Sequence, residues 1–287
     1  MRRKITAIIL AMLMILTLTP MNAFAAAPSV QEVETLIAQI GTVSRENRSA
    51  VEKAVNAYNQ LDDASKAGVS NFDVLAEAQQ ILGIKDALAK LEMHQDKVEN
   101  TKIWFSPYTE KCEETGQSVV ALCIGMKENI NMPMLMMSME YIGDKDLRMN
   151  AIKIRAGDNK FTYNSGAFEK IERGNIKINN IEKYAERGTT WVEEFDIKML
   201  KEFLSADEVI VRFQRENYGT TEYIDHTVTP EERQAITDVL NAYNLMCSVS
   251  PEVLHKALAE FWTSGPPTTP RLYTVRNVII AYKNIVC

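Results

Sequence analysis

The chain has 287 residues, 46% of them hydrophobic, and a formal net charge of −6. This length is enough for two domains with separate cores. The acidic balance argues against nucleic acid and anionic membranes as partners, because both are bound through lysine and arginine contacts to phosphate.

Residues 1–25 have the pattern of a secretory signal peptide. Three cations stand at positions 2–4, an apolar run follows from 5 to about 18, and the triplet Ala23-Phe24-Ala25 has the small-x-small pattern of a cleavage site. The run is too short for a membrane span, so we expect cleavage before Ala26 and a secreted or extracellular product, with an uncleaved anchor as the alternative. Removing the segment takes away three of 32 cations and none of 38 acids, which leaves a net charge of −9.

The rest of the chain predicts no membrane anchor. No later segment reaches the roughly 18 apolar residues that a membrane span requires. No LPxTG-like sorting signal precedes a hydrophobic end, and no cysteine follows the cleavage triplet. We therefore expect any association with the cell surface to be non-covalent.

Residues 26–95 are expected to form a small helical bundle. Apolar residues recur with helical spacing in three stretches, at 33–40, 51–61 and 69–82. Gly41 and Gly83 are expected to end the first and third helices, and Asn47 or Ser49 to cap the second. Helices this short must bury their apolar faces against one another, because none is stable alone. Helix-favouring residues continue from 84 to 100, and we expect a domain boundary near 95–102.

The same residues carry a resemblance to a known family. The segments are IAQIGTV (37–43), AVNAYNQL (54–61), VSN (69–71) and LAEAQQIL (75–82). In order and spacing, residues 31–92 resemble a small helical repeat found, often in tandem, in secreted surface proteins of Gram-positive bacteria. The chain departs from the pattern at 76–78 and holds the repeat once. The resemblance implies a spacer or adhesion-associated module without catalytic residues.

Residues 100–246 are expected to form a mainly antiparallel β-rich α+β domain. Short runs rich in β-formers occur at 118–127, 134–141, 149–155, 160–163, 175–181, 189–197 and 208–214. A helical segment, IKMLKEFLSA, separates the last two, which favours an antiparallel sheet over repeated strand–helix units. At 229–243 we expect a helix across the sheet, with Thr229 as N-cap, Pro230 at the first position and Glu232 completing a capping box.

The order of a WxEEFD strand, a short helix, a VIVRFQ strand and a TPEER helix resembles a domain that recurs in uncharacterised exported proteins of Firmicutes. The resemblance implies a location and a fold, and no established activity. Residues 247–287 follow as a tail. We expect one helix there, SPEVLHKALAEFW, then a stiff Pro-rich linker and an apolar end that covers the sheet, adds a strand or stays unpacked.

The stretch NMPMLMMSME, at 131–140, raises the question of a soft-metal site. A copper site needs about three thioethers converging on one ion. Strand alternation instead points Met134 and Met136 to one face and Met137 and Met139 to the other. We therefore expect a central strand buried on both faces, with methionine as a flexible core filler.

Cysteine and histidine spacing predicts no metal site and no cofactor. No CxxC or HxxxH pattern occurs, and the three histidines, His94, His226 and His255, are scattered. Export permits disulfides, but spacing does not choose among the three pairings of the four cysteines. These are Cys112, Cys123, Cys247 and Cys287.

Candidate ligand-binding residues are four aromatics, which can stack on sugar rings or pack in the core. They are Trp104, Trp191, Tyr218 and Tyr223. An acidic cluster follows Trp191. On a strand over 189–197, Glu194 and Asp196 share one face, where Arg212 from a later strand can pair with one of them. Adjacent carboxylates on a strand point to opposite faces, which argues against a glycosidase pair.

No GxSxG, HExxH, GxxxxGK[ST] or GxGxxG motif occurs. We therefore expect a monomeric, non-catalytic binding or spacer protein outside the cell, with a cell-wall or host glycan or protein as ligand. The alternative is an extracellular hydrolase of glycan or peptide whose site no motif reveals. Exposed aromatics on one sheet face would favour binding, whereas convergent carboxylates or a Cys–His contact in a cleft would favour hydrolysis. A polar-lined pocket would be the most informative feature.

Overall fold

A computed structural model describes residues 27–96, 100–127, 132–217 and 219–263. The expected signal peptide, Tyr218, Cys287 and the Pro-rich part of the tail lie outside these residues. Within the described ranges, no helix is both long and apolar enough to cross a membrane.

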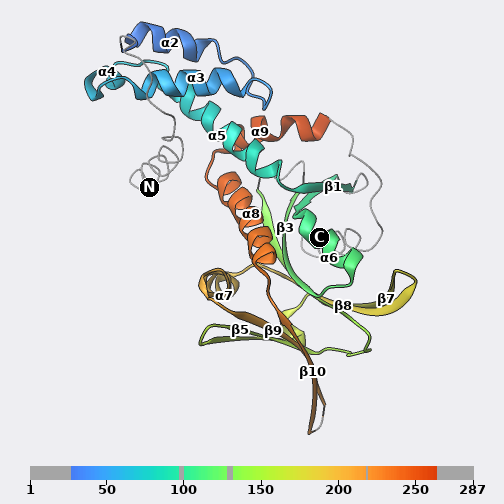
Figure 1. The fold of residues 1–287 in the computed structure, drawn as a ribbon. Coiled ribbons are helices and arrows are strands. Elements are labelled where there is room, and N and C mark those ends of the chain that lie inside the picture. The colour runs from blue at the N-terminus through green and yellow to red at the C-terminus, as the bar shows by residue number, and fades with distance from the viewer. Residues whose placement is uncertain (1–26, 97–99, 128–131, 218, 264–287) are drawn as a thin grey trace.

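The described residues form an α+β fold with antiparallel strands, as predicted, but the strands form two sheets where we expected one (Figure 1). The six-stranded sheet has the order β1 (Glu92–Asp96), β2 (Thr101–Phe105), β3 (Val119–Lys127), β4 (Met134–Gly143), β8 (Ile181–Trp191), β7 (Lys170–Ile178). The four-stranded sheet has the order β10 (Thr220–Thr227), β9 (Val209–Asn217), β5 (Ala151–Ala156), β6 (Asn159–Asn164), and a short 3-10 turn, η1 (Ser165–Ala167), follows β6.

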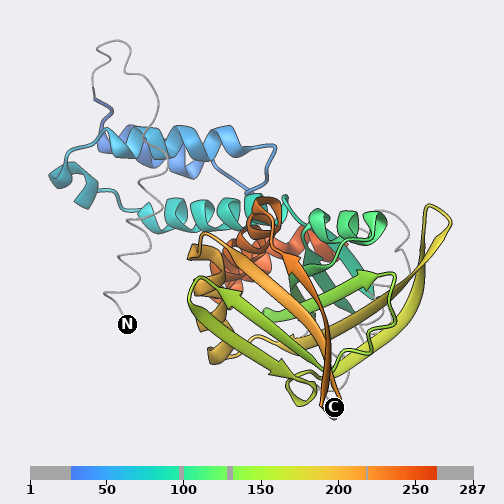
Figure 2. The same ribbon diagram turned by 60° about the horizontal axis from the view of Figure 1, so that its bottom comes forward.

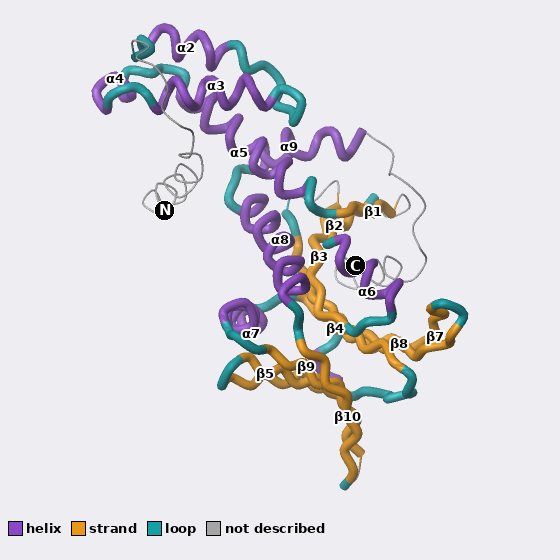
Figure 3. The backbone as a smooth tube through the Cα atoms, viewed as in Figure 1, coloured by secondary structure: helices purple, strands orange, loops and turns teal. Residues whose placement is uncertain are grey.

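Four helices precede the sheets: α2 (Val30–Ala38), α3 (Arg48–Asn59), α4 (Asp63–Ala67) and α5 (Phe72–Leu88). Ser29 and Glu32 form a capping box at the start of α2, and Asp62 caps α4. Buried side chains such as Val33, Ile37 and Leu75 form a core separate from that of the sheets. These helices gather at one end of the molecule and the strands at the other (Figure 3).

Helix α5 belongs to both parts of the molecule. We expected Gly83 to end it, but the helix continues to Leu88. Its second half, including Ile84 and Leu88, is buried in the core of the sheets and packs against helices α8 (Pro230–Cys247) and α9 (Pro251–Thr263). Tertiary burial therefore outweighs the low helix propensity of glycine here. Figure 2 shows α5 passing from the other helices to the side of the sheets.

Three elements differ from the expectation for residues 84–117, and strand β2 is one of them, because the predicted strands begin only at 118. Strand β1 forms where we expected more helix, because its residues pair antiparallel with β2, His94 opposite Ile103. Helix α6 (Pro107–Thr115) was not predicted. Its start follows the rules for helix N-termini, since Ser106 is the N-cap and Pro107 the first residue.

The main core lies between the two sheets and under α7 (Glu194–Ser205), α8 and α9. Strand β4 is central in its sheet, between β3 and β8. Met137 and Met139 are buried in the main core, whereas Met136 is buried on the opposite face with Ile103 and Phe105. The prediction of a methionine-filled strand buried on both faces is confirmed.

Helix α8 lies against β3, and its first turn differs from the predicted capping box. Thr229 Oγ1 accepts from the Glu232 backbone N–H, as expected of an N-cap. The Glu232 carboxylate is fully buried and accepts instead from the Val120 backbone N–H at 2.7 Å. Its other oxygen is 2.8 Å from His226 Nε2. Glu232 thus joins α8 to β3 and β10.

The predicted helix of the tail is present as α9. Val253, Leu254, Ala257 and Leu258 are buried in the main core. The backbone N–H of Val253 donates to Ser250 Oγ, so Ser250 caps the start of this helix.

Candidate functional site

The three predicted ligand-binding aromatics that the structure describes, Trp104, Trp191 and Tyr223, do not form one surface. Trp104 is fully buried and makes an edge contact with Phe261, so it is a core residue. Trp191 is half-buried on the face of Met136. Tyr223 is exposed on β10, with its ring 3.9 Å from the Arg212 guanidinium carbon.

The predicted acidic face is also absent, because residues 189–197 are not one strand. Strand β8 ends at Trp191 and α7 begins at Glu194. Glu193 and Asp196 form a capping box at this start, and buried Asp196 accepts from the Tyr163 hydroxyl at 2.7 Å. Glu194 is exposed in the first turn.

Arg212 does not pair with Glu194 or Asp196. It donates from Nε and Nη2 to the two carboxylate oxygens of Asp225, each at 2.7 Å. The two residues face each other across the β9–β10 ladder. The hydrogen bond from Arg212 lowers the pKa of Asp225.

A polar cavity of about 620 Å³ lies beside β7 and β8. The segment before β5, strands β7 and β8, and the end of β9 each contribute to its wall. Three arginines, two acids, a tyrosine and an asparagine are its polar side chains. They are Arg148, Arg173, Arg215, Asp146, Glu186, Tyr184 and Asn175.

The buried carboxylate of Glu186 holds several groups of the cavity wall in place. Its side chain is buried, and its two oxygens accept from the backbone N–H groups of Arg148 and Met149 at 2.5 and 2.7 Å. Arg173 Nε also donates to Glu186 at 3.2 Å, and Arg173 Nη2 donates to the Met149 carbonyl at 2.7 Å. One buried carboxylate therefore fixes both the backbone and an arginine of the wall.

The cavity wall includes a residue with unusual backbone geometry. Arg148 has a φ of 51°, in the left-handed region that non-glycine residues seldom adopt. Such a conformation costs about 1–3 kcal/mol and persists where surrounding contacts hold it, often at functional sites. The hydrogen bond from its N–H to Glu186 is one such contact.

The cavity carries more positive than negative charge, in a chain whose net charge is negative. Asp146 pairs with Arg148 at 2.9 Å and Glu186 pairs with Arg173. Arg215 is half-buried and forms no ion pair with any residue that the structure describes. Its guanidinium is therefore available to an anionic group. A larger cavity, between α2 and α3, is lined mainly by uncharged polar residues.

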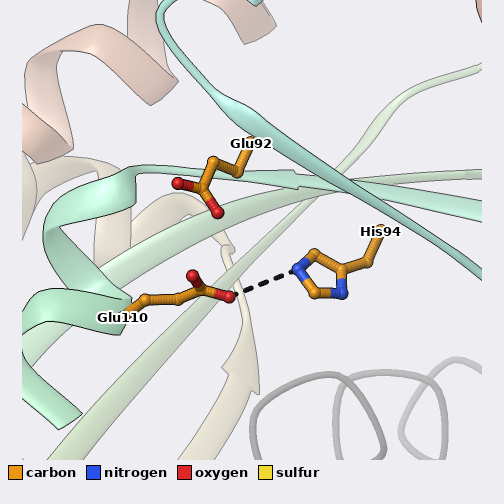
Figure 4. Close-up of side chains that lie close together, drawn as sticks. All are labelled: Glu92, His94 and Glu110. Atoms are coloured by element: carbon orange, nitrogen blue, oxygen red, sulfur yellow. Dashed lines mark ion pairs between the residues drawn. The ribbon is translucent and has the colours of Figure 1, made fainter. Parts of the chain in front are cut away.

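A second cluster joins β1 to α6. Glu92 and His94 are two residues apart on β1 and so point to the same face. Glu110 comes from the first turn of α6, which follows directly after β2, the partner of β1. The two carboxylates and the imidazole converge (Figure 4), with one ligand atom of each within 4.8 Å of the others.

Burial changes the protonation of this cluster. Desolvation lowers the pKa of His94, whose ring also packs against Phe105 with 4.8 Å between centroids. The pKa of Glu92 is raised, first by burial and then by the nearby Glu110 carboxyl group. At neutral pH the imidazole is therefore mainly uncharged, and the Glu110 carboxyl group disfavours ionisation of Glu92.

Sequence reasoning missed both groups of residues. The cavity residues come from four separate segments, and no spacing connects them. The position of Glu110 could have been predicted, because Ser106-Pro107 is a recognisable helix start that places Glu110 in a first turn. Its contact with His94 depends on the β1–β2 pairing, which the sequence between 84 and 100 does not indicate.

Comparisons with protein-family models, with curated proteins and with solved structures each found no significant match.

Proposed function

We propose that this chain is a non-catalytic binding protein that acts outside the cell, at its surface or after release, with the arginine-lined cavity as its ligand site. Helices α2, α3 and α4 and the first half of α5 act as a spacer module that presents the sheets, since the second half of α5 and strand β1 pack with the sheets. The signal-peptide pattern and the resemblance of residues 31–92 to a surface-protein repeat support the location and the spacer role.

The cavity is the observation that carries the binding function. Its volume lies within the range of small-ligand pockets, roughly 300–1,000 Å³, and its arginines are planar donors suited to carboxylate, sulfate or phosphate groups. Tyr184, about a third exposed, offers a ring face to a sugar. The ligand class that fits is an acidic extracellular glycan, with an acidic peptide as the alternative.

The test is a binding screen of the chain beginning at Ala26 against uronic-acid, sulfated and neutral glycans, cell-wall fragments and acidic peptides. We expect binding to acidic ligands that weakens as salt rises, because charge attraction is screened. Arg215→Gln should lower the affinity at least tenfold. Arg155→Gln is the matched control, since Arg155 is an exposed arginine on β5 that pairs with Glu208 outside the cavity lining. Binding that Arg215→Gln leaves unchanged would exclude this cavity, and a wholly negative screen would exclude the function.

An extracellular hydrolase of glycan or peptide is a second candidate, and one observation favours it. Glu92 and Glu110 are convergent carboxylates, and the pKa of Glu92 is raised as a general acid requires. A broad screen of glycan and peptide substrates tests this candidate. Turnover that Glu92→Gln and Glu110→Gln abolish would support it, and absence of cleavage would reject it.

A further inference from the structure

We propose that Glu92, His94 and Glu110 form a binding site for a divalent transition-metal ion, with Zn²⁺ as the ion that fits best. The site does not depend on the cavity of Arg215 or on the proposed binding function. It uses one imidazole nitrogen and two carboxylate oxygens, all of which are zinc ligands in proteins.

The distance between two of the ligand atoms agrees with tetrahedral coordination. His94 Nε2 and Glu110 Oε1 are 3.3 Å apart. Charge-assisted hydrogen bonds are usually shorter, about 2.7–2.9 Å. Ligands bonded to zinc at about 2.0–2.2 Å in a tetrahedron are separated by about 3.3–3.6 Å. The observed gap is at the lower end of this range, so one metal ion can bind both atoms without a change in their separation.

The charges of the cluster also call for a cation. The ligand oxygens of Glu92 and Glu110 lie within 4.8 Å of each other, and Glu114 adds a further negative charge nearby. Within the described part of the chain, neither Glu92 nor Glu110 forms an ion pair with lysine or arginine. A bound divalent ion would neutralise both carboxylates at once.

Packing holds the histidine of the cluster in place. The His94 side chain is only 11% exposed. Its ring lies against Phe105 with 4.8 Å between centroids, which restricts its rotation. The ligand is thus largely positioned before an ion arrives.

The surroundings leave room for a fourth ligand. The Glu110 side chain is 32% exposed, so solvent reaches the cluster. Three protein ligands with one position taken by water is the arrangement of zinc sites that act on substrates, whereas closed sites have four protein ligands. A nitrogen ligand in the set favours zinc and other transition metals over Mg²⁺ and Ca²⁺, which prefer oxygen.

The test is calorimetric titration of the chain beginning at Ala26, stripped of metal with a chelator, against Zn²⁺, Mg²⁺ and Ca²⁺. Because thiolates also bind zinc, the titrations use a background in which Cys247 and Cys287 are serine. We expect one zinc ion per chain, with Mg²⁺ and Ca²⁺ binding at least a hundredfold more weakly. His94→Gln, Glu92→Gln and Glu110→Gln should each weaken zinc binding at least tenfold.

His255→Gln is the matched control, because His255 is an exposed histidine on α9 outside the cluster. It should leave zinc affinity unchanged. Circular dichroism and the melting temperature of each variant without zinc show whether it folds, and zinc should raise the melting temperature of the parent and of His255→Gln only. The proposal is overturned if the parent does not bind zinc, or if folded His94→Gln binds it as tightly as the parent.

Discussion

Glu140 on β4 and Arg187 on β8 lie directly opposite each other, and Glu140 Oε2 accepts from Arg187 Nη2 at 2.6 Å with both side chains almost fully buried. Arg187 Nη2 also donates to Glu113, which fixes α6 over this face of the sheet. Burial opposes the charge of Arg187, but the two carboxylates outweigh it and raise its pKa. The group is thus a buried ion triad that holds a helix to a sheet.

Removal of Arg187 should destabilise the protein severely. Arg187→Ala leaves the buried Glu140 carboxylate without its cation and removes one partner of the partly buried Glu113, so we expect the free energy of unfolding to fall by about 3–5 kcal/mol. Arg155→Ala breaks an exposed pair with Glu208 and should change it by about 0–1 kcal/mol. Urea denaturation of both variants measures the difference, and equal losses would contradict the buried-triad interpretation.

Glu232 should matter more as an anchor between elements than as a helix cap. Glu232→Ala leaves the buried Val120 N–H without its acceptor and should cost about 2–4 kcal/mol. Thr229→Ala removes only the N-cap and should cost about 1 kcal/mol. Glu232→Gln keeps an acceptor for Val120 and should lie between the two. Thermal unfolding of the three variants gives the order of their stability losses. Thr229→Ala would be the most destabilising if the N-cap were the main contribution of this turn.

Substitution of Gly83 should stabilise the protein. A Cβ at this position meets no atom within 4 Å, and the residue is inside α5. Gly83→Ala should therefore raise the free energy of unfolding by about 0.5–1 kcal/mol. Gly188→Ala is the contrasting variant, because its Cβ would lie 2.7 Å from the Phe168 ring and should destabilise by about 1–3 kcal/mol. A loss of stability in Gly83→Ala would argue against the uninterrupted helix.

The described cysteines should react at different rates. Cys112, Cys123 and Cys247 are free thiols. Burial raises the pKa of Cys112 to about 11 and of Cys123 to about 12, so at pH 8 about a thousandth or less of each is thiolate. Cys247 is exposed. Brief treatment with iodoacetamide followed by peptide mass spectrometry should find Cys247 alkylated at least tenfold faster than Cys112 and Cys123, and comparable rates at all three would refute the buried positions.

Local periodicity predicted those elements whose patterns are unambiguous. The methionine strand alternates, and α9 has a cap, a proline and an apolar stripe, so both were predictable. The segment 189–197 was mistaken for one strand because Trp191 and Val192 favour β-structure, although Glu193 and Asp196 have capping-box spacing. That spacing was visible in the sequence and outweighs strand propensity.

The sites depend on contacts between distant segments, which local patterns do not contain. Arg215 reaches the cavity only because β9 ends beside β7 and β8. His94 meets Glu110 only because β1 pairs with β2, and Glu232 binds Val120 across 112 residues of sequence. Each of these contacts can be recognised only when the tertiary arrangement of the segments is known.

The uninterrupted course of α5 has a mechanical consequence. Its 17 residues span about 25 Å, and its two halves are anchored in different cores. A force applied to α2 or α3 would be transmitted along the axis of α5 to the packing of Leu88 against the sheets. Under such a force, the side-chain contacts at one end of α5 would break first. Rotation of the two parts of the molecule relative to each other would require the helix itself to bend.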